Sequence, residues 1–69
     1  MVNEDLAANI RRYREEAGLS QEAAARLIDV SWSTWNQWER GKVDIPTSRL
    51  PAIAEALKTS QPALVAPPA

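Results

Sequence analysis

The chain has 69 residues, of which 45% are apolar and 25% charged, and its formal net charge is −1. A chain of this length fills one hydrophobic core, so these residues form one domain rather than two. Cysteine and histidine are both absent, which excludes disulfides and removes the two usual ligands of a structural zinc site. Nucleophilic and acid-base catalysis mostly uses the same side chains, or carboxylates in a deep pocket that so short a chain rarely forms. We therefore expect no enzyme activity, no metal site and no cofactor.

Charge and hydropathy limit the location and the partners. No apolar stretch approaches the roughly 20 residues of a membrane span, and the first residues are acidic where a signal peptide is basic. We expect a cytoplasmic protein without a membrane partner. The near balance of 8 basic and 9 acidic side chains disfavours nucleic-acid binding by bulk charge, so such binding would need local placement of charge.

The first predicted helix covers residues 4–17, because apolar residues recur there with the period of one helical face. These residues are Leu6, Ile10, Tyr13 and Ala17. Gly18 follows as a left-handed helix stop, and Gly41 is expected to do the same after the helix-like run that ends at residue 40. Ser20 then caps a short second helix over residues 21–28, whose apolar positions are Ala24, Leu27 and Ile28.

A tight turn precedes the third predicted helix, over residues 32–40. Asp29 tolerates a left-handed conformation, and Ser31 is a suitable N-cap. Tryptophans recur at every third position, which spreads them over roughly 120° of the helix, so they cannot be equally buried. We expect Trp35 and Trp38 in the core.

Proline positions define the last two predicted helices. Thr47 or Ser48 can cap a fourth helix that begins near residues 48–50, and Pro51 is tolerated in its first turn. Its apolar face is formed by Leu50, Ile53, Ala54 and Leu57. Ser60 before Pro62 predicts a last helical turn over residues 62–66, and residues 67–69 form a flexible proline-rich tail. No strand-like alternation occurs, so the fold is predicted to be all-α, a compact five-helix bundle.

Two short helices joined by a turn of about three residues have helix-turn-helix geometry, here over about residues 20–40. The stretches that carry a family resemblance are Ile10-Arg11-Arg12-Tyr13-Arg14-Glu15-Glu16-Ala17-Gly18-Leu19-Ser20-Gln21, Val30-Ser31, Ser33-Thr34, Glu39-Arg40-Gly41-Lys42, Leu50 and Ile53-Ala54-Glu55-Ala56-Leu57. With them the chain resembles the phage repressor and Cro type of helix-turn-helix domain, also called the xenobiotic-response-element type. The resemblance implies a lambda-repressor-like DNA-binding domain over residues 1–66 that acts as a homodimer on a pseudo-palindromic operator in double-stranded DNA. A transcriptional regulator, in particular a repressor, is expected.

The resemblance places the third helix in the major groove. With Trp35 and Trp38 turned inward, the outward side chains are Trp32, Ser33, Asn36 and Gln37, which we expect to contact bases. Amides suit this role because Asn or Gln can pair with adenine through a donor and an acceptor. The alternative is an ordinary solvated polar face.

A second set of residues is expected to hold phosphates. The set consists of Gln21, Ser31, Arg40 and Lys42. Gln21 begins the second helix, and the resembled family grips the DNA backbone at that position. Arg40, Lys42 and Arg49 form a basic edge that only Asp44 opposes. The alternative roles are an exposed first-turn glutamine and surface charges that maintain solubility.

Trp32 departs from the polar or basic residue common in the family, and three interpretations remain open. Its ring can stack on a sugar or touch a thymine methyl group, join a protein contact, or fold over the second helix as additional core.

The resemblance also implies two structural relationships. Arg14 and Glu39 match an ion pair that ties the first helix to the end of the third. Ala24 stands where the family usually has leucine, and we hypothesise that Trp35 fills the missing volume. Asp29 replaces the glycine common in the turn.

The dimer surface is not apparent from the sequence, although Leu64, Val65 and the last helix are candidates. A rival function is a protein-interaction module, such as an antitoxin or a repressor partner, that keeps the same fold. Net acidity and Trp32 favour this rival slightly.

Overall fold

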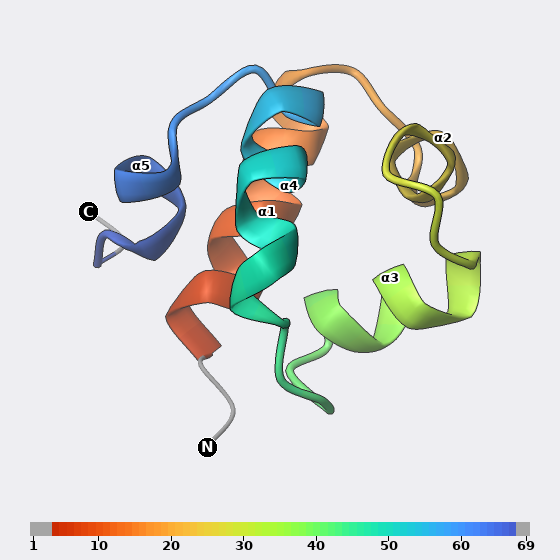
Figure 1. Cartoon of the computed structure of the whole chain (residues 1–69), viewed down its shortest axis with the longest axis horizontal. Helices are drawn as coiled ribbons and strands as arrows, with labels where there is room; N and C mark the ends of the chain where they lie inside the picture. Colours follow the sequence, from red (N-terminus) through yellow and green to blue (C-terminus); the bar gives the residue numbers. More distant parts are fainter. Residues whose placement is uncertain (1–3, 68–69) are drawn as a thin grey trace.

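A computed structural model describes residues 4–67 and shows six helical segments. They are α1 (Glu4–Glu16), α2 (Gln21–Leu27), α3 (Trp32–Glu39), the 3-10 turn η1 (Thr47–Arg49), α4 (Leu50–Ala56) and α5 (Gln61–Val65). The described residues contain no strand, so the predicted all-α fold with five α-helices is confirmed. Figure 1 shows α2 and α3 on one side of the molecule and α5 on the other.

Serine caps start three of the helices as predicted. Ser20, Ser31 and Ser60 each adopt an extended backbone conformation, and each side chain accepts a hydrogen bond from the N–H three residues later. These bonds satisfy N–H groups that have no partner within the helix. The starts of α2, α3 and α5 are therefore determined locally.

Left-handed residues end the helices. Asp29 has a φ of 58°, and Gly18 and Gly41 have φ values of 75° and 68°, as the sequence predicts. Lys58, just after α4, also has a positive φ of 57°, which was not predicted. Residues other than glycine are strained in this conformation, and Asp and Asn tolerate it best. Of the two non-glycine residues, Asp29 and Lys58, only Asp29 therefore carries a sequence signal.

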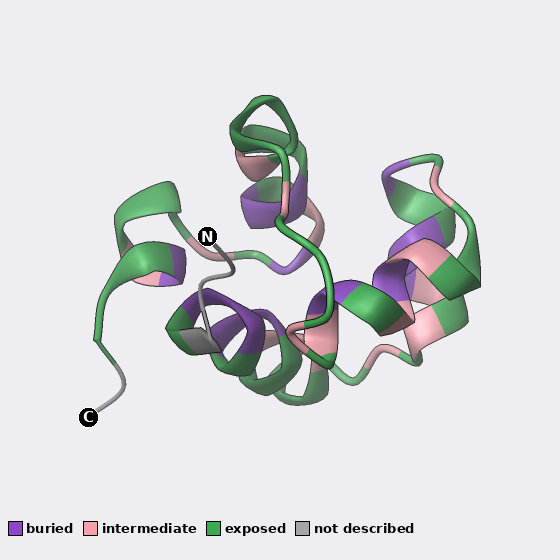
Figure 2. Ribbon diagram, turned by 90° about the horizontal axis from the view of Figure 1, so that it is seen from below, coloured by how far each residue is buried: buried purple, intermediate pink, exposed green. Residues whose placement is uncertain are grey.

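The core lies where α1, α3, α4 and α5 meet, with α2 packed against α3 (Figure 2). Its largest fully buried side chains are Trp35, Ile10, Ile53 and Leu64. Asn9 is the one polar residue among those described that is buried as a whole, backbone included. Its Nδ2 donates to the carbonyl oxygens of Leu64 at 2.8 Å and Ala66 at 2.7 Å, which ties α1 to the end of α5.

Two burial predictions are wrong. Leu27 lies on the predicted apolar face of the second helix but is 60% exposed, because α2 is short and ends at this residue. Leu64, a candidate for the dimer contact, is completely buried in the core and is unavailable to a partner, whereas its neighbour Val65 is exposed.

The fourth helix begins within the predicted range, at Leu50, but its cap differs from the prediction. Neither Thr47 nor Ser48 caps α4, because both belong to the 3-10 turn η1 and the N-cap position is Arg49, which makes no side-chain capping bond. Pro51 does lie in the first turn of α4. Pro67 follows α5 as an exposed residue, and residues 68 and 69 of the predicted tail lie outside the described residues.

Candidate nucleic-acid interface

The helices α2 and α3 form a helix-turn-helix whose turn is held by the backbone and by one side chain. Val30 N–H donates to the carbonyl oxygen of Ala25 at 3.0 Å, and Asp29 N–H donates to that of Arg26 at 3.2 Å. From η1, the Arg49 guanidinium donates to the Ile28 carbonyl oxygen at 3.3 Å. Arg49 was expected only as part of a basic edge, but here it connects η1 to the end of α2.

Helix α3 has one buried and one exposed face, as its tryptophan spacing predicts. Trp35 and Trp38 are buried, with ring centroids 5.8 Å apart and ring planes at 56°, a tilted arrangement that aromatic pairs favour. Trp32 is 52% exposed, so its interpretation as additional core is wrong. The other expected base-contacting residues are also accessible, since Ser33 and Gln37 are exposed and Asn36 is half-buried.

A hydrogen-bond network centred on Gln21 connects α2 to this exposed face. Gln21 Oε1 accepts from Trp32 Nε1 at 3.1 Å and from Asn36 Nδ2 at 3.2 Å. Gln21 Nε2 donates to Glu39 Oε1 at 3.1 Å. We call Gln21, Trp32, Asn36 and Glu39 the Gln21 network. The network fixes two expected base-contacting side chains relative to α2.

The ion pair between Arg14 and Glu39 is present and anchors the network to α1. Arg14 Nε donates to Glu39 Oε2 at 2.6 Å, and Arg14 Nη2 donates to Glu39 Oε1 at 3.1 Å. Arg14 Nη1 also donates to the Leu19 carbonyl oxygen at 2.8 Å, and Trp35 Nε1 donates to Glu39 Oε2. The two side chains are 12% and 3% exposed, so the end of α3 is attached to α1 by a shielded, bidentate pair.

The pair shifts the pKa of both groups in the directions expected for partners. Burial alone would raise the pKa of Glu39, but the hydrogen bonds from Arg14, Gln21 and Trp35, with the charge of Arg14, outweigh it, and the pKa is lowered. The hydrogen bond to Glu39 raises the pKa of Arg14 against the opposing effect of burial. Both groups are therefore charged at neutral pH.

The expected phosphate-binding residues divide into two kinds. Arg40 and Lys42 are exposed just beyond α3, where long cationic side chains can reach a DNA backbone. Gln21 and Ser31 already have intramolecular partners. The Ser31 hydroxyl donates to Thr34 Oγ1 at 2.9 Å while accepting from the Thr34 N–H at 3.1 Å, so its single proton is used within α3.

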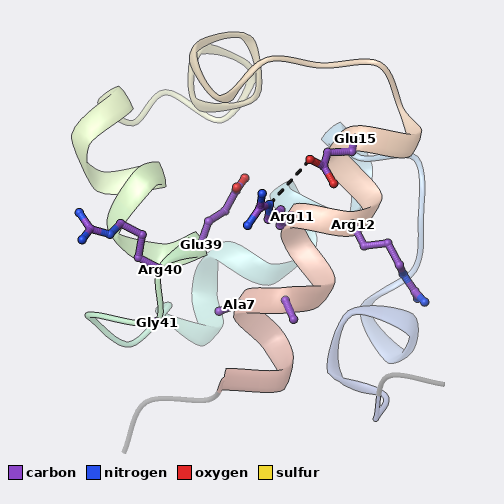
Figure 3. A pocket seen from close by; sticks show the side chains of 8 residues that line it. Ala7, Arg11, Arg12, Glu15, Glu39, Arg40 and Gly41 are labelled. Carbon is purple, nitrogen blue, oxygen red and sulfur yellow. Dashed lines mark ion pairs between the residues drawn. The ribbon is translucent and has the colours of Figure 1, made fainter.

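A groove of about 380 Å³ is lined by residues of α1 and of the end of α3 (Figure 3). Arg11 and Arg12 of α1 line it together with Arg40, and Figure 3 shows Arg11 directed toward Glu15, its ion-pair partner at 3.7 Å. Arg40 extends away from the groove in the same view. From the sequence, no functional role was assigned to Arg11 or Arg12. No group of three or more potential metal ligands occurs within the described residues.

A family model described as a helix-turn-helix domain matches residues 5–67. The chain belongs to this helix-turn-helix domain family. The matched region includes every described helix from Asp5 onward, so the α2 and α3 pair lies within the segment that defines the family.

Two relatives are similar to the domain in sequence. The control protein C.SmaI of Serratia marcescens is 36% identical over 64 residues, which cover 93% of this chain and 76% of that protein. The type II methyltransferase M.MspI of Moraxella sp is 35% identical over 49 residues, which cover 71% of this chain and 12% of the methyltransferase. The similarity to M.MspI covers only a small part of that enzyme, so it gives no reason to expect methyltransferase activity in this chain.

Solved structures are similar to the domain over most of its length. The hypothetical transcription factor NHTF from Neisseria has a TM-score of 0.90 and 31% identity, covering 99% of this chain and 78% of that one. The restriction-modification controller protein C.AhdI from Aeromonas hydrophila has a TM-score of 0.83 and 28% identity, covering 88% and 92%. The P22 c2 repressor protein in complex with a synthetic operator has a TM-score of 0.79 and 28% identity, covering 87% and 91%.

These relatives support DNA-binding transcriptional regulation. C.SmaI, C.AhdI and the P22 c2 repressor match over most of their own length, and by description they are regulators rather than enzymes. Within residues 4–67, no helix of the domain is long and apolar enough to cross a membrane.

The lowered pKa of Glu39 predicts that the free energy of unfolding of the domain decreases at acid pH. A carboxyl group whose pKa is lower in the folded state stabilises the fold above its unfolded pKa, about 4.3 for glutamate, and this contribution disappears as the pH falls through the folded pKa. We expect the free energy of unfolding to fall below about pH 4.3 and to fall less steeply in Glu39→Gln. Urea denaturation followed by circular dichroism across this range measures both slopes.

The matched control is Glu15→Gln, which removes a carboxylate whose ion pair with Arg11 is largely exposed. Exposed pairs contribute little, so this variant should keep the acid slope of the unmodified domain. An unchanged slope in Glu39→Gln would show that the Arg14 pair does not couple stability to pH.

Proposed function

We propose that the domain is a sequence-specific double-stranded DNA-binding transcriptional regulator, a repressor, that places α3 in the major groove. The observation that supports this most directly is the outward face of α3, where Trp32, Ser33, Asn36 and Gln37 are accessible and uncharged. A face of amide and hydroxyl groups suits base edges because it offers donors and acceptors without strong hydration. Such a role implies a cytoplasmic location.

The Gln21 network favours Asn36 as an adenine-contacting residue. An asparagine amide has two N–H donors and one carbonyl acceptor. Gln21 Oε1 engages Nδ2 through one donor. The second donor and the carbonyl remain for adenine N7 and N6, which need this pair of groups. Gln21 would thus orient Asn36 before DNA binds.

The phosphate contacts come from Arg40 and Lys42, with Gln21 and Ser31 as additional candidates. Gln21 Nε2 donates one N–H to Glu39, and no other partner of this atom occurs among the described residues, so its second N–H can meet a phosphate. Ser31 would have to redirect its hydroxyl proton from Thr34. With so few contacts, the affinity of one subunit should depend only weakly on salt. The logarithm of the affinity should fall with the logarithm of the salt concentration by about 0.9 per neutralised phosphate, which is the salt slope.

Dimerisation on a pseudo-palindromic operator would double both the base contacts and the phosphate contacts. We propose residues 1–66 as the DNA-binding unit and the end of α5 as the dimer contact. Val65 is 49% exposed there and lines an apolar groove with Leu6, Val43 and Leu50. A second copy of the same patch would cover these side chains in a two-fold interface.

The second candidate function is a protein-interaction module. The observation that favours it is the 60% exposure of Leu27 at the end of α2, outside the proposed DNA and dimer contacts. A partner protein that covers Leu27 would leave α3 free, so this function need not exclude DNA binding.

Selection from random duplex oligonucleotides at low salt tests DNA binding directly. We expect enrichment of an inverted repeat. No enrichment by the folded protein would contradict the proposal and favour the protein-interaction module. Gln37→Ala should relax the selected sequence at one position per half-site, because one amide contact is worth about 1–3 kcal/mol of discrimination.

Lys42→Ala is the matched control, since Lys42 is exposed near Gln37 but is assigned to a phosphate. It should weaken binding to all sequences alike and lower the salt slope by about 0.9 per subunit without changing the selected sequence.

A further inference from the structure

Trp32 presents an exposed aromatic ring whose only polar group already has a partner. The indole has a single donor, Nε1–H, and no acceptor. That donor is bonded to Gln21 Oε1 at 3.1 Å, while the side chain remains 52% exposed at the first turn of α3. The accessible part of Trp32 is therefore carbon surface without hydrogen-bonding capacity.

We propose that Trp32, held by Gln21, recognises the C5-methyl group of a pyrimidine in the major groove. This inference rests on the proposed function and names the chemistry of one base contact. Among the four standard bases, the C5-methyl of thymine is the apolar group on a major-groove edge. The methyl group of 5-methylcytosine lies at the same ring position, so both bases offer the chemistry that the ring surface can recognise.

The Gln21 network keeps the ring in this orientation. Gln21 Oε1 also accepts from Asn36, and Gln21 Nε2 donates to Glu39, which is held by Arg14. Turning the indole outward to offer Nε1–H to a base would break the bond to Gln21. Trp32 therefore contributes an apolar contact, while Asn36 beside it contributes the polar one.

The surroundings of the ring disfavour stacking on the DNA backbone. Trp32 borders a hollow that also contains Glu22, Asp29 and Arg26, so two carboxylates and one guanidinium lie beside it. This net negative charge repels a phosphate. Ala25 and Val30 line the same hollow and add apolar surface. A base edge with a methyl group suits this environment better than a sugar and its phosphates.

The test replaces thymine by deoxyuridine, one position at a time, in the selected operator. This change removes only the C5-methyl group. At one position per half-site we expect affinity to fall about fourfold, the effect of losing one buried methyl group. In Trp32→Ala the same replacement should change affinity by less than the error of measurement. The proposal would be overturned if operators with thymine and with deoxyuridine bind equally well at every position. It would also be overturned if Trp32→Ala loses as much affinity on this replacement as the unmodified domain.

A second arm compares a C·G pair with a 5-methylcytosine·G pair at the same position. The methylated pair should bind more tightly by a similar factor, although both pairs bind more weakly if neighbouring polar contacts require thymine. A response to thymine alone would contradict recognition of the methyl group as such and would assign the effect to local DNA shape.

Gln21→Ala tests the positioning role. It should reduce the ratio of thymine to deoxyuridine affinities toward one, because the ring is no longer fixed. Gln61→Ala is the matched control, since Gln61 is likewise the first residue of a serine-capped helix, α5, but is exposed and lies outside the network, and it should keep the ratio. An unchanged ratio of thymine to deoxyuridine affinities in Gln21→Ala would overturn the positioning role of Gln21. Failure to select any operator would instead contradict the proposed function.

Discussion

Replacing Trp35 with isoleucine lowers the free energy of unfolding by about 2–4 kcal/mol, one of the largest losses expected from any single change in this domain. Trp35 is completely buried, packs at 5.8 Å from Trp38 and donates its indole N–H to Glu39. Isoleucine leaves a cavity and removes that donor. Equilibrium unfolding in urea, followed by far-ultraviolet circular dichroism because the fluorescence probe itself is changed, measures the loss.

The same substitution tests whether Trp35 fills the volume that Ala24 leaves empty. Both residues are completely buried in one cluster, on the packed helices α2 and α3. Ala24→Leu alone should overpack the core and cost about 1–3 kcal/mol. Combined with Trp35→Ile it should recover the part of the loss due to the cavity, so the two effects are strongly non-additive. Additive losses would contradict the compensation hypothesis.

Trp35→Phe separates the hydrogen bond from the volume. Phenylalanine keeps an aromatic ring but cannot donate to Glu39, and a hydrogen bond to a charged group is worth about 1.5–3 kcal/mol. Ala24→Leu should give less recovery in the Trp35→Phe background than with Trp35→Ile, because less space is available. The difference between the two backgrounds measures the cavity contribution.

Local signals predicted the helices well. Ser20, Ser31 and Ser60 cap helices where expected, and Gly18, Asp29 and Gly41 adopt the left-handed conformation where expected. Each of these features depends on a residue and its neighbours within one turn, which a single sequence contains. Lys58 shows the limit, since nothing in its side chain distinguishes it as a left-handed residue.

Burial was harder to predict than secondary structure, because it depends on what packs against each face. Leu27 and Leu64 both follow helical periodicity, yet Leu27 is exposed at the end of α2 and Leu64 is enclosed between α1 and α4. Asn9 lies on the inward face of α1 beside Ile10, a signal that could have identified it as a buried polar residue. Its carbonyl partners, 55 and 57 residues away, could not be predicted.

The candidate site was predictable as a set of residues but not as a network. The tryptophan spacing indicated that the three rings are not equally buried, and the resemblance paired Arg14 with Glu39. The role of Gln21 as an acceptor for both Trp32 and Asn36 depends on how α2 crosses α3, which no local pattern specifies. The base and phosphate assignments themselves remain predictions.

Arg14→Met is expected to destabilise the domain by about 3–5 kcal/mol, because it leaves the Glu39 carboxylate buried without its counter-charge. The Glu39 side chain is 3% exposed and, among the described residues, keeps only the donors of Gln21 and Trp35. Adding Glu39→Gln removes the isolated charge and keeps one acceptor oxygen, so one of the two donors loses its partner, which costs less than a buried charge without a counter-charge. The double variant should therefore be more stable than Arg14→Met alone, and a further loss on adding Glu39→Gln would contradict a charge-based origin.

The pH dependence of Arg14→Met provides an independent check on the same pair. Removing Arg14 removes the main interactions that lower the pKa of Glu39, so the carboxyl group is protonated at a higher pH than in the unmodified domain. As the pH falls, the unmodified domain loses the free energy that the Arg14–Glu39 pair contributes to folding, whereas the variant has no such contribution. The difference between their free energies of unfolding therefore narrows. A difference that stays constant would mean that Arg14 acts by packing alone.

The same variant should also affect DNA binding, because Glu39 accepts a hydrogen bond from Gln21. Arg14→Met should bind a selected operator more weakly even under conditions where it remains folded, since Gln21 in turn holds Trp32 and Asn36 of α3.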